Sequence, residues 1–254
     1  MSDGREDRVA LVTGAGRGIG AEIARQLVES GVRVAITDLD EQAATSTAKE
    51  LQARHGEDRV TAALLDIADP ASIQAALALV EAELGPVDIL VNNAGVDRIG
   101  PFVDSDEETW DLLLAVNLRG PIAMSHATVP GMVSRGWGRI VNISSDAGKV
   151  GSSGEVVYSA TKGGLIAFSK ALARETAAAG LTVNCVCPGP TDTALLDQVA
   201  DANRSLYDSL ARAVPMRRIG QPSDVAPAVV FLSGEGASYI TGQALSVSGG
   251  LTMN

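Results

Sequence analysis

A tyrosine, a lysine and a serine stand at a spacing that could support acid–base chemistry. Tyr158 is followed four residues later by Lys162, and Ser145 lies upstream of both. If the segment is helical, residues four apart share a face, so the ammonium lies beside the phenol. A free phenol has a pKa of about 10, and a cation about 4 Å away at an effective dielectric of about 20 favours the phenolate by about 4 kcal/mol before desolvation. By itself this spacing also fits an exposed helix pair, so the rest of the chain must distinguish a catalytic tyrosine from a structural one.

A glycine-rich segment with the character of a phosphate-binding loop runs from Thr13 to Gly20. Glycines let the backbone turn sharply and approach a pyrophosphate, while a helix N-terminus supplies free N–H groups and a positive dipole. The spacing is G-x-x-x-G-x-G, because Ile19 stands where the G-x-G-x-x-G pattern has its last glycine. A glycine-rich turn without a ligand is the alternative interpretation. The residues predicted to bind a dinucleotide here are Gly14, Arg17, Gly18, Ile19 and Gly20.

Asp38 ends the second predicted strand and comes after this loop. A carboxylate in that place accepts hydrogen bonds from the hydroxyls of an adenosine ribose and repels a 2′-phosphate. NAD is therefore favoured over NADP. Arg17 opposes this preference, since a basic residue in the loop could hold a phosphate, but Asp38 would lie directly against the 2′ position.

Short apolar runs alternate with longer amphipathic segments along the whole chain. The runs are Val9–Val12, Val32–Ile36, Val60–Leu65, Val87–Val91, Arg139–Ile143, Leu181–Val186 and Ala244–Val247. Such runs are typical of strands buried on both faces. The alternation predicts an α/β fold: a single doubly wound Rossmann domain over residues 1–254, with about seven parallel strands and helices on both faces.

Several residues mark where the helices between these strands begin and end. Gly31 is placed to end the first helix, and Asp69 followed by Pro70 is typical of an N-cap and a first turn. Ser105 with Glu108 fits a capping box ahead of a long helix. The region at about 190–220 is long, polar and without a strand pattern, and we expect it to form a helical flap over a cleft.

Composition narrows the class of partner. The chain has 254 residues with a net charge of −11, which argues against nucleic acid or an anionic membrane as the main partner. Its two cysteines, Cys185 and Cys187, form no disulfide framework and are expected to be buried, and its two histidines lack metal-ligand spacing, so we expect no metal site. The N-terminal residues do not resemble a signal peptide and no run of about 20 apolar residues is present, so a cytoplasmic location is expected.

From about Arg8 to the C-terminus, the chain resembles the short-chain dehydrogenase/reductase family of the ~250-residue type. Beyond the glycine loop, motifs of that family occur in order. The resemblance implies adenine contacts from Asp66 and Ile67, a cofactor cleft shaped by Asn92, Asn93, Ala94 and Gly95, a catalytic Asn117 in a helix, an active site of Ser145, Tyr158 and Lys162, and nicotinamide contacts from Pro188, Gly189, Thr191 and Thr193.

The mechanism that this resemblance implies is the interconversion of a secondary alcohol and a ketone with NAD. Tyr158 takes or gives the hydroxyl proton, and Ser145 donates a hydrogen bond to the reacting oxygen. Lys162 lowers the pKa of the tyrosine and binds the nicotinamide ribose, and Asn117 anchors a water that links Lys162 to solvent. The cofactor carries the hydride chemistry. Ser145 as a turn cap and Asn117 as a partner of helix backbone groups are the structural alternatives.

A narrower resemblance concerns the substrate. The stretches 150–155, 187–195 and 240–253 are similar to 2-hydroxycyclohexanecarboxyl-CoA dehydrogenases, which implies a cyclic hydroxyacyl-CoA substrate. An apolar pocket is expected from Leu195, Leu196, Val199 and Leu206, with a further wall from Asp97, Asp146, Val150 and Val156. Arg204, Arg212, Arg217 and Arg218 are either solvated helix charges or contacts for the phosphates of CoA.

Other functions remain open from the sequence. A 3-oxoacyl thioester reductase would normally prefer NADPH, which Asp38 opposes. A non-catalytic dinucleotide-binding regulator would be expected to lack one of Ser145, Tyr158 or Lys162, and a sugar-nucleotide epimerase would be longer. The family resemblance also implies a homotetramer formed through helices at about Asp106–Ser134 and Tyr158–Ala178 and through the C-terminal strand region.

Overall fold

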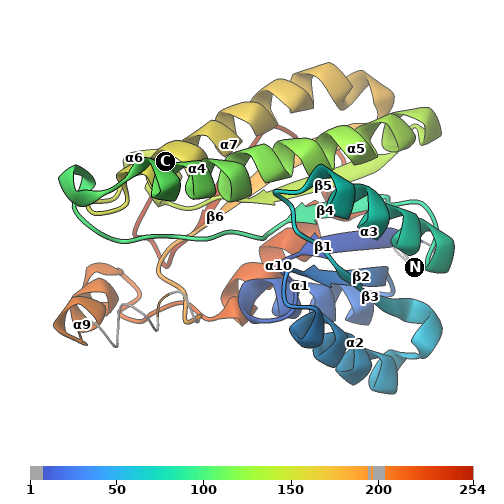
Figure 1. The fold of residues 1–254 in the computed structure, drawn as a ribbon, viewed down its shortest axis with the longest axis horizontal. Coiled ribbons are helices and arrows are strands. Elements are labelled where there is room, and N and C mark those ends of the chain that lie inside the picture. The colour runs from blue at the N-terminus through green and yellow to red at the C-terminus, as the bar shows by residue number, and fades with distance from the viewer. Residues whose placement is uncertain (1–7, 194–195, 197–203, 254) are drawn as a thin grey trace.

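The computed structural model describes residues 8–193, 196 and 204–253. They contain a seven-stranded parallel sheet in the order β3-β2-β1-β4-β5-β6-β7 (Figure 1). The strands are β1 Val9–Thr13, β2 Arg33–Asp38, β3 Val60–Leu64, β4 Ile89–Asn92, β5 Gly138–Ile143, β6 Leu181–Pro188 and β7 Ala244–Val247. Each lies within two residues of the run predicted for it, so the predicted sheet is confirmed.

Helices cover both faces of this sheet (Figure 1). One face carries α1 Gly18–Glu29, α2 Glu41–His55 and α10 Pro222–Leu232, and the other carries α3 Pro70–Glu83, α4 Glu107–Leu114, α5 Gly120–Arg135 and α7 Val156–Thr176. Two further helices are α6 Ala147–Val150 and α9 Arg204–Ala213. The 3₁₀ turns are η1 Glu57–Arg59, η2 Phe102–Asp104, η4 Ala177–Ala179 and η5 Glu235–Ala237, and η3 Ala115–Arg119 is a π-helical turn. This is the doubly wound arrangement expected from the sequence.

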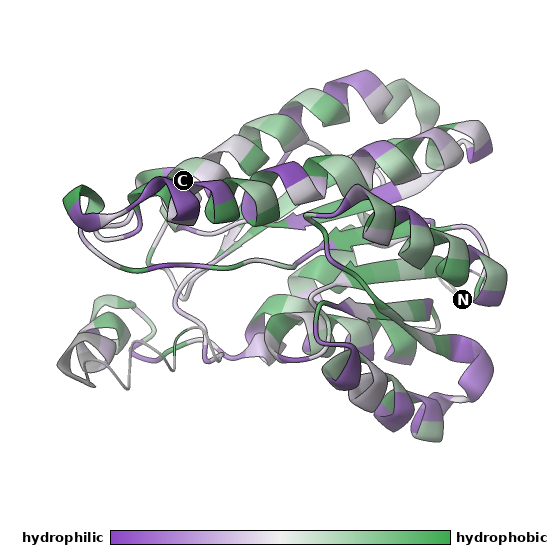
Figure 2. Cartoon of the chain, viewed as in Figure 1, coloured by the Kyte–Doolittle hydropathy of each residue, from purple (hydrophilic) through white to green (hydrophobic). Residues whose placement is uncertain are grey.

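Two apolar layers make up the core, one on each face of the sheet. Ala10 and Val12 of β1 belong to the layer under α1, α2 and α10. Val9 and Leu11 belong to the layer under α3, α5 and α7. Successive strand residues point to opposite faces, so a strand covered on both sides needs an unbroken apolar run. Figure 2 shows this as hydrophobic strands between helices with polar outer faces.

The predicted end of α1 and start of α3 are confirmed by their hydrogen bonds. Gly31 has φ +94°, and the N–H groups of Gly31 and Val32 donate to the carbonyls of Val28 and Leu27. This is the Schellman arrangement that favours glycine. At α3, Asp69 Oδ1 accepts the Ala71 N–H at 3.0 Å, directly before Pro70.

The predicted capping box at Ser105 and Glu108 is wrong. Asp106 is the N-cap of α4, and its Oδ1 accepts the Thr109 N–H at 2.8 Å. Ser105 Oγ accepts instead from Trp110 Nε1 at 2.8 Å. The aspartate one position later satisfies the free N–H groups of the helix, and the indole takes the serine hydroxyl.

The long helix predicted over Asp106–Ser134 is interrupted once, by the wide turn η3 between α4 and α5. A π-helical turn inserts one extra residue into a helix and is often found at functional sites. Here it carries Asn117, which is fully buried.

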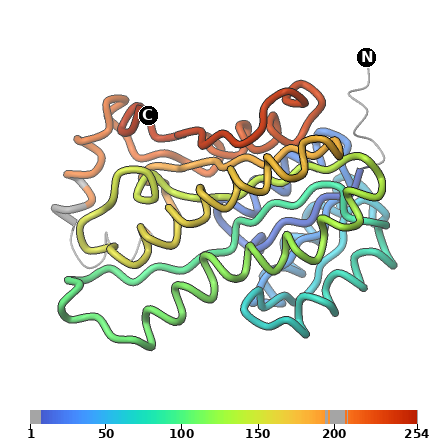
Figure 3. Tube along the Cα trace, turned by 90° about the horizontal axis from the view of Figure 1, so that it is seen from above, coloured from blue at the N-terminus to red at the C-terminus, as the bar shows by residue number. Residues whose placement is uncertain are grey.

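The segment after β6 returns to the sheet before α10 begins. Thr191 pairs with Gly220 in an isolated parallel bridge, and the Gly220 N–H donates to the Pro190 carbonyl. Between these ends lies α9, which sits at the same end of the molecule as η2 in both Figure 1 and Figure 3. The predicted flap region thus contains the helix α9, and its role as a flap over a cleft stays a prediction.

Candidate active site

A cavity of about 530 Å³ opens at the carboxyl ends of the strands. Here the strand order reverses, because β1 lies between β2 and β4. In open parallel sheets, ligands bind at such a switch point. Its lining includes Ile19 from the glycine loop, Asn93 and Gly95 after β4, and Ser145, Tyr158 and Lys162.

Contacts with the segment after β4 hold the glycine loop in a tight turn. Gly14 has φ +62°, and a Cβ at that position would lie 2.8 Å from the Ala94 Cα. Asn93 Nδ2 donates to the carbonyls of Thr13 at 2.9 Å and Gly14 at 2.8 Å. A Cβ at Gly20 would lie 2.3 Å from the Gly14 carbonyl oxygen. Asn93 and Ala94 therefore fix the loop, and their contact with a cofactor stays a prediction.

The start of α1 fits a dinucleotide phosphate. Arg17 is its N-cap, its exposed side chain makes no capping hydrogen bond, and the first turn has no acidic residue. Free N–H groups at a helix N-terminus attract an anion. The backbone at Gly18 has φ +59°, a conformation that favours glycine.

Asp38 is positioned for a ribose. Its Oδ2 accepts the Gly16 N–H at 2.9 Å, and its Oδ1 accepts the Asp40 N–H at 3.0 Å. Each carboxylate oxygen has a further lone pair. The half-buried carboxylate lies directly against the loop and fits a ribose diol, so the residues present fit NAD.

Asp66 and Ile67 lie after β3, outside the cavity lining. Asp66 Oδ1 accepts the Ala68 N–H at 2.8 Å. Ile67 is buried under Gly120, where a Cβ would lie 2.8 Å from the Ile67 side chain. Their contact with an adenine stays a prediction.

Ser145, Tyr158 and Lys162 meet on the floor of the cavity. Ser145 follows β5, and Tyr158 and Lys162 lie one turn apart on α7. Lys162 Nζ is 5.5 Å from the centroid of the Tyr158 ring and donates to the Ile143 carbonyl at 3.0 Å. The Ser145 hydroxyl interacts with the Tyr158 hydroxyl and acts to lower its pKa, and Ser145 Oγ also accepts the Ala147 N–H at 3.1 Å. The spacing of these residues in the sequence thus predicted a real cluster.

The electrostatics of this cluster differ from the prediction. Burial raises the pKa of Tyr158 above its usual value, and the charges of Asp97 and Glu155 raise it further. Burial also lowers the pKa of Lys162 to about 8. The expectation that Lys162 brings the pKa of Tyr158 toward neutrality is therefore wrong here, because the ammonium is itself buried and two carboxyls oppose it.

Asn117 lies beside Lys162 and is bound to the backbone of Val96. Its Oδ1 accepts the Val96 N–H at 2.9 Å, and its Nδ2 donates to the Val96 carbonyl at 2.8 Å. A Cβ at Gly95 would lie 3.1 Å from Asn117 Oδ1 and 3.4 Å from Lys162 Nζ, so both polar groups border this glycine. The side chain therefore satisfies the backbone N–H and carbonyl of Val96 in the loop after β4, and its role in anchoring a water stays a prediction.

The segment predicted to touch the nicotinamide lines the cavity. It contributes Pro188, Gly189, Thr191 and Thr193. Thr191 Oγ1 donates to the Gly189 carbonyl at 2.9 Å, which folds the chain into the cleft. A Cβ at Gly189 would lie 2.8 Å from the Ser248 Cβ, so this close approach requires glycine.

The expected substrate wall is only partly present. Asp97, Asp146, Val150 and Leu196 line the cavity. Val156 is 50% exposed and lies instead at a separate small hollow beside Phe102 and Trp110. Leu195 and Val199 lie outside the described residues, as does the side chain of Leu206.

The arginines expected at CoA phosphates do not reach the cavity where they are described. Arg212, Arg217 and Arg218 are exposed, and Arg218 pairs with Asp224 at 2.7 Å. The side chain of Arg204 is outside the described part. The described arginines are therefore better explained as solvent-exposed charges than as a binding site for the phosphates of CoA.

Several residues that line the cavity were not predicted from the sequence. Glu155 is one; it is the N-cap of α7, three residues before Tyr158, and this closeness in the sequence could have revealed it. Ile99, Leu210 and Leu251 come from three distant segments that only the fold brings together.

Metal and membrane features are absent from the part of the chain that the structure describes. Within it, no group of three or more His, Cys, Asp or Glu side chains could hold a metal ion. No helix there has the length and apolarity to cross a membrane. Cys185 and Cys187 are fully buried, as predicted, and burial raises their pKa values to about 12 and about 11.

Comparisons with known proteins identify the family. Residues 14–252 match a family model described as Enoyl-(Acyl carrier protein) reductase. The chain is 41% identical over 248 residues to the 3-oxoacyl-(acyl-carrier-protein) reductase FabG of Salmonella typhimurium, covering 98% of each chain. It is 42% identical over 245 residues to the acetoacetyl-CoA reductase of Rhizobium meliloti, covering 96% of this chain and 98% of that one. The protein belongs to the short-chain dehydrogenase/reductase family and is an oxidoreductase that acts on CH–OH or keto groups.

Proposed function

We propose that this oxidoreductase interconverts a 3-oxoacyl thioester and a 3-hydroxyacyl thioester, with NAD(H) as its cofactor. The proposal rests on one observation of the site. Ser145 and Tyr158 line the same cavity and their hydroxyls interact, so one carbonyl oxygen can approach both of them. The substrate class comes from relatives named for 3-oxoacyl and acetoacetyl thioesters.

Each residue of the cluster has a defined task in this reaction. Tyr158 donates its proton to the carbonyl oxygen during reduction and accepts it during oxidation. Ser145 donates a hydrogen bond to the same oxygen and stabilises the charge that develops there. Lys162 lies behind the ring and carries the proton onward past Asn117. NAD(H), when bound, supplies or accepts the hydride. The raised pKa of Tyr158 keeps it as the phenol, the form that donates in reduction.

The choice of NAD over NADP rests on Asp38. A 2′-phosphate would have to approach a carboxylate that is already held by two backbone N–H groups. The negative charges of a phosphate and a carboxylate repel each other at short distance, and the exposed Arg17 is the one cation of the loop that could offset this repulsion. The test is the ratio of kcat/KM for NADH and NADPH. An efficiency that favours NADPH would refute this part of the proposal.

A cyclic hydroxyacyl-CoA is the second candidate, because one side of the cavity is apolar. Ile99, Val150, Leu196, Leu210 and Leu251 contribute to this wall, which could accept a ring. The relatives named above do not support the ring substrate, so it ranks behind the 3-oxoacyl thioester.

A substrate panel distinguishes the two. Reduction of acetoacetyl-CoA and of 2-oxocyclohexanecarboxyl-CoA is followed by the loss of NADH absorbance. We expect higher kcat/KM for acetoacetyl-CoA. A clear preference for the cyclic thioester would make the cyclic hydroxyacyl-CoA the first candidate. No turnover of either thioester would refute both substrates.

A further inference from the structure

Three carboxyl groups line the cavity that holds Tyr158. They belong to Asp97 after β4, to Asp146 after β5 and to Glu155 at the start of α7. Among the described residues of the lining, Lys162 is the one cation. Neither the proposed proton transfer nor the hydrogen bond to the reacting oxygen uses any of these carboxyls.

Asp97 and Glu155 form a carboxyl pair beside the catalytic tyrosine. Asp97 is 4% exposed, its Oδ1 accepts the Arg98 N–H at 2.7 Å, and Glu155 lines the same cavity and interacts with its carboxyl. Burial and the charge of Glu155 raise the pKa of Asp97 to about 7. Above that pH Asp97 is a carboxylate that faces a second acidic side chain in the cavity.

Two cations lie near this pair, and among the described residues each donates to a backbone carbonyl and forms no ion pair with the two carboxyls. The Arg98 guanidinium donates to the Asp97 carbonyl at 2.7 Å, and its side chain is exposed. Lys162 Nζ donates to the Ile143 carbonyl, and burial lowers its pKa to about 8. Among the described residues, the two carboxyls therefore have no cation paired with them to balance their negative charge.

Asp146 adds a third carboxyl at the same end. It is 5% exposed, and neither of its oxygens has a hydrogen-bond partner among the residues described. Its Oδ2 would lie 3.6 Å from a Cβ at Gly189, which is itself in the cavity lining. A third acidic side chain, without a hydrogen-bond donor to offset it, therefore makes this end of the cavity unfavourable for a further carboxylate.

We propose that Asp97, Glu155 and Asp146 make the substrate cavity selective for uncharged acyl groups, such as esters and thioesters, over the corresponding free acids. This rests on the proposed function, since the same 3-oxo group must reach Tyr158 in either case. A free acid would bring a fourth carboxylate into a cavity with one buried cation. At about 8 Å and an effective dielectric of about 20, each carboxylate in the cavity weakens the binding of another by about 30-fold.

The test compares one acid with its ester, so that size and the keto group stay almost the same. At pH 8, acetoacetate and methyl acetoacetate are titrated into the enzyme with NADH bound, and binding is read from the fluorescence of the bound cofactor. The wild-type protein should bind the ester at least about tenfold more tightly. In Asp97→Asn and in Glu155→Gln, the preference for the ester should fall about tenfold or more in each.

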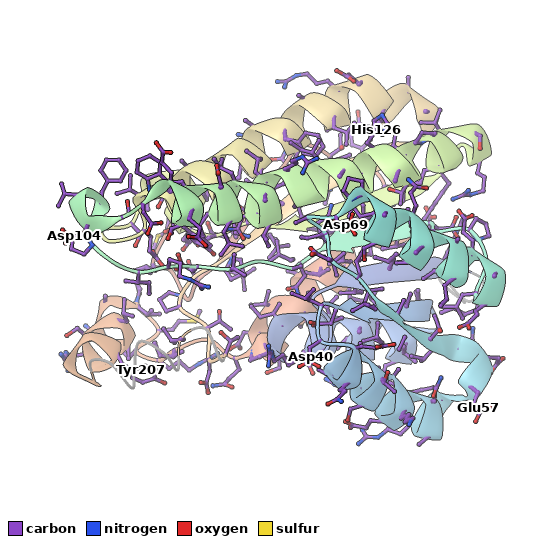
Figure 4. The ribbon with its side chains drawn as sticks, viewed as in Figure 1. Asp40, Glu57, Asp69, Asp104, His126 and Tyr207 are labelled. Carbon is purple, nitrogen blue, oxygen red and sulfur yellow. The ribbon has the colours of Figure 1, made fainter. Side chains whose placement is uncertain are left out.

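Asp104→Asn is the matched control. Asp104 is exposed on η2 and does not line the cavity, and Figure 4 labels it at the outer end of that loop. This variant should keep the wild-type preference. A wild-type protein that binds acid and ester equally, or binds neither, overturns the proposal. So does a preference that survives both cavity substitutions.

A separate assay of acetoacetyl-CoA reduction keeps this result distinct from the proposed function. Turnover of the thioester without discrimination between acid and ester refutes only the selectivity. Discrimination without turnover of the thioester refutes only the proposed function.

Discussion

The substitution Asp97→Asn should make the protein more stable at high pH. In the wild-type protein, Asp97 is almost fully buried, and its pKa rises from 3.8 to about 7 because of burial and of Glu155. Asparagine keeps the shape of the side chain. It can still accept the Arg98 N–H, and its amide can donate to Glu155. What it removes is the cost of ionising a buried carboxyl.

The sign follows from the direction of the shift. A raised pKa means that Asp97 favours folding while it is protonated in both states, below about pH 4, and that this contribution is lost as the pH rises through about 7. A shift of about three pKa units corresponds to about 4 kcal/mol at most, at 1.36 kcal/mol per unit. Since Glu155 shares the titration, part of this free energy belongs to the pair.

The assay is urea unfolding followed by circular dichroism between pH 4 and pH 8, at one protein concentration because assembly shifts apparent stability. Between pH 4 and pH 8, the free energy of unfolding of the variant should rise by up to about 4 kcal/mol relative to that of the wild-type protein. The control Asp104→Asn should follow the wild-type curve. Parallel curves for wild type and Asp97→Asn would show that Asp97 ionises freely and would refute the reasoning.

Three further predictions concern the cofactor loop and the assembly. Asp38→Asn keeps an oxygen for the Gly16 N–H but removes the charge, so kcat/KM for NADPH relative to NADH should rise at least about tenfold; an unchanged ratio would remove Asp38 from the choice of cofactor. Gly14→Ala should cost about 1–3 kcal/mol of stability in thermal unfolding, more than Gly136→Ala, because both glycines have positive φ but only at Gly14 would the Cβ meet a neighbour; equal losses would contradict this. Light scattering should give about four times 26.0 kDa if the chain forms the proposed homotetramer, and a monomer mass would exclude it.

The sheet and the reactive cluster were predictable because local patterns encode them. A short, mostly apolar run between turn residues is typical of a strand covered on both faces, and all seven runs became strands. The four-residue spacing of Tyr158 and Lys162 fixes their relation on any helix, whatever packs around it. The end of α1 at Gly31 was equally local, since the turn there requires positive φ.

What the sequence did not reveal depends on contacts between distant segments. Burial raises the pKa of Tyr158 most, and the charge of Asp97 raises it further; Asp97 reaches the tyrosine because β4 and β5 are neighbours in the sheet. The same holds for Leu251, which comes from the C-terminal end of the chain to the cavity wall. At Ser105, two adjacent residues were able to cap one helix, and only the position of the Trp110 indole decided between them.

The central claim is that the Tyr158 hydroxyl exchanges the proton with the substrate oxygen, and Tyr158→Phe tests it most directly. Tyr239→Phe is the control, because that ring is fully exposed. In single-turnover oxidation and reduction with saturating NAD(H), Tyr158→Phe should slow the chemical step at least about 100-fold while cofactor affinity stays within about threefold of wild type. A variant that retains more than a few per cent of the wild-type rate would contradict the account.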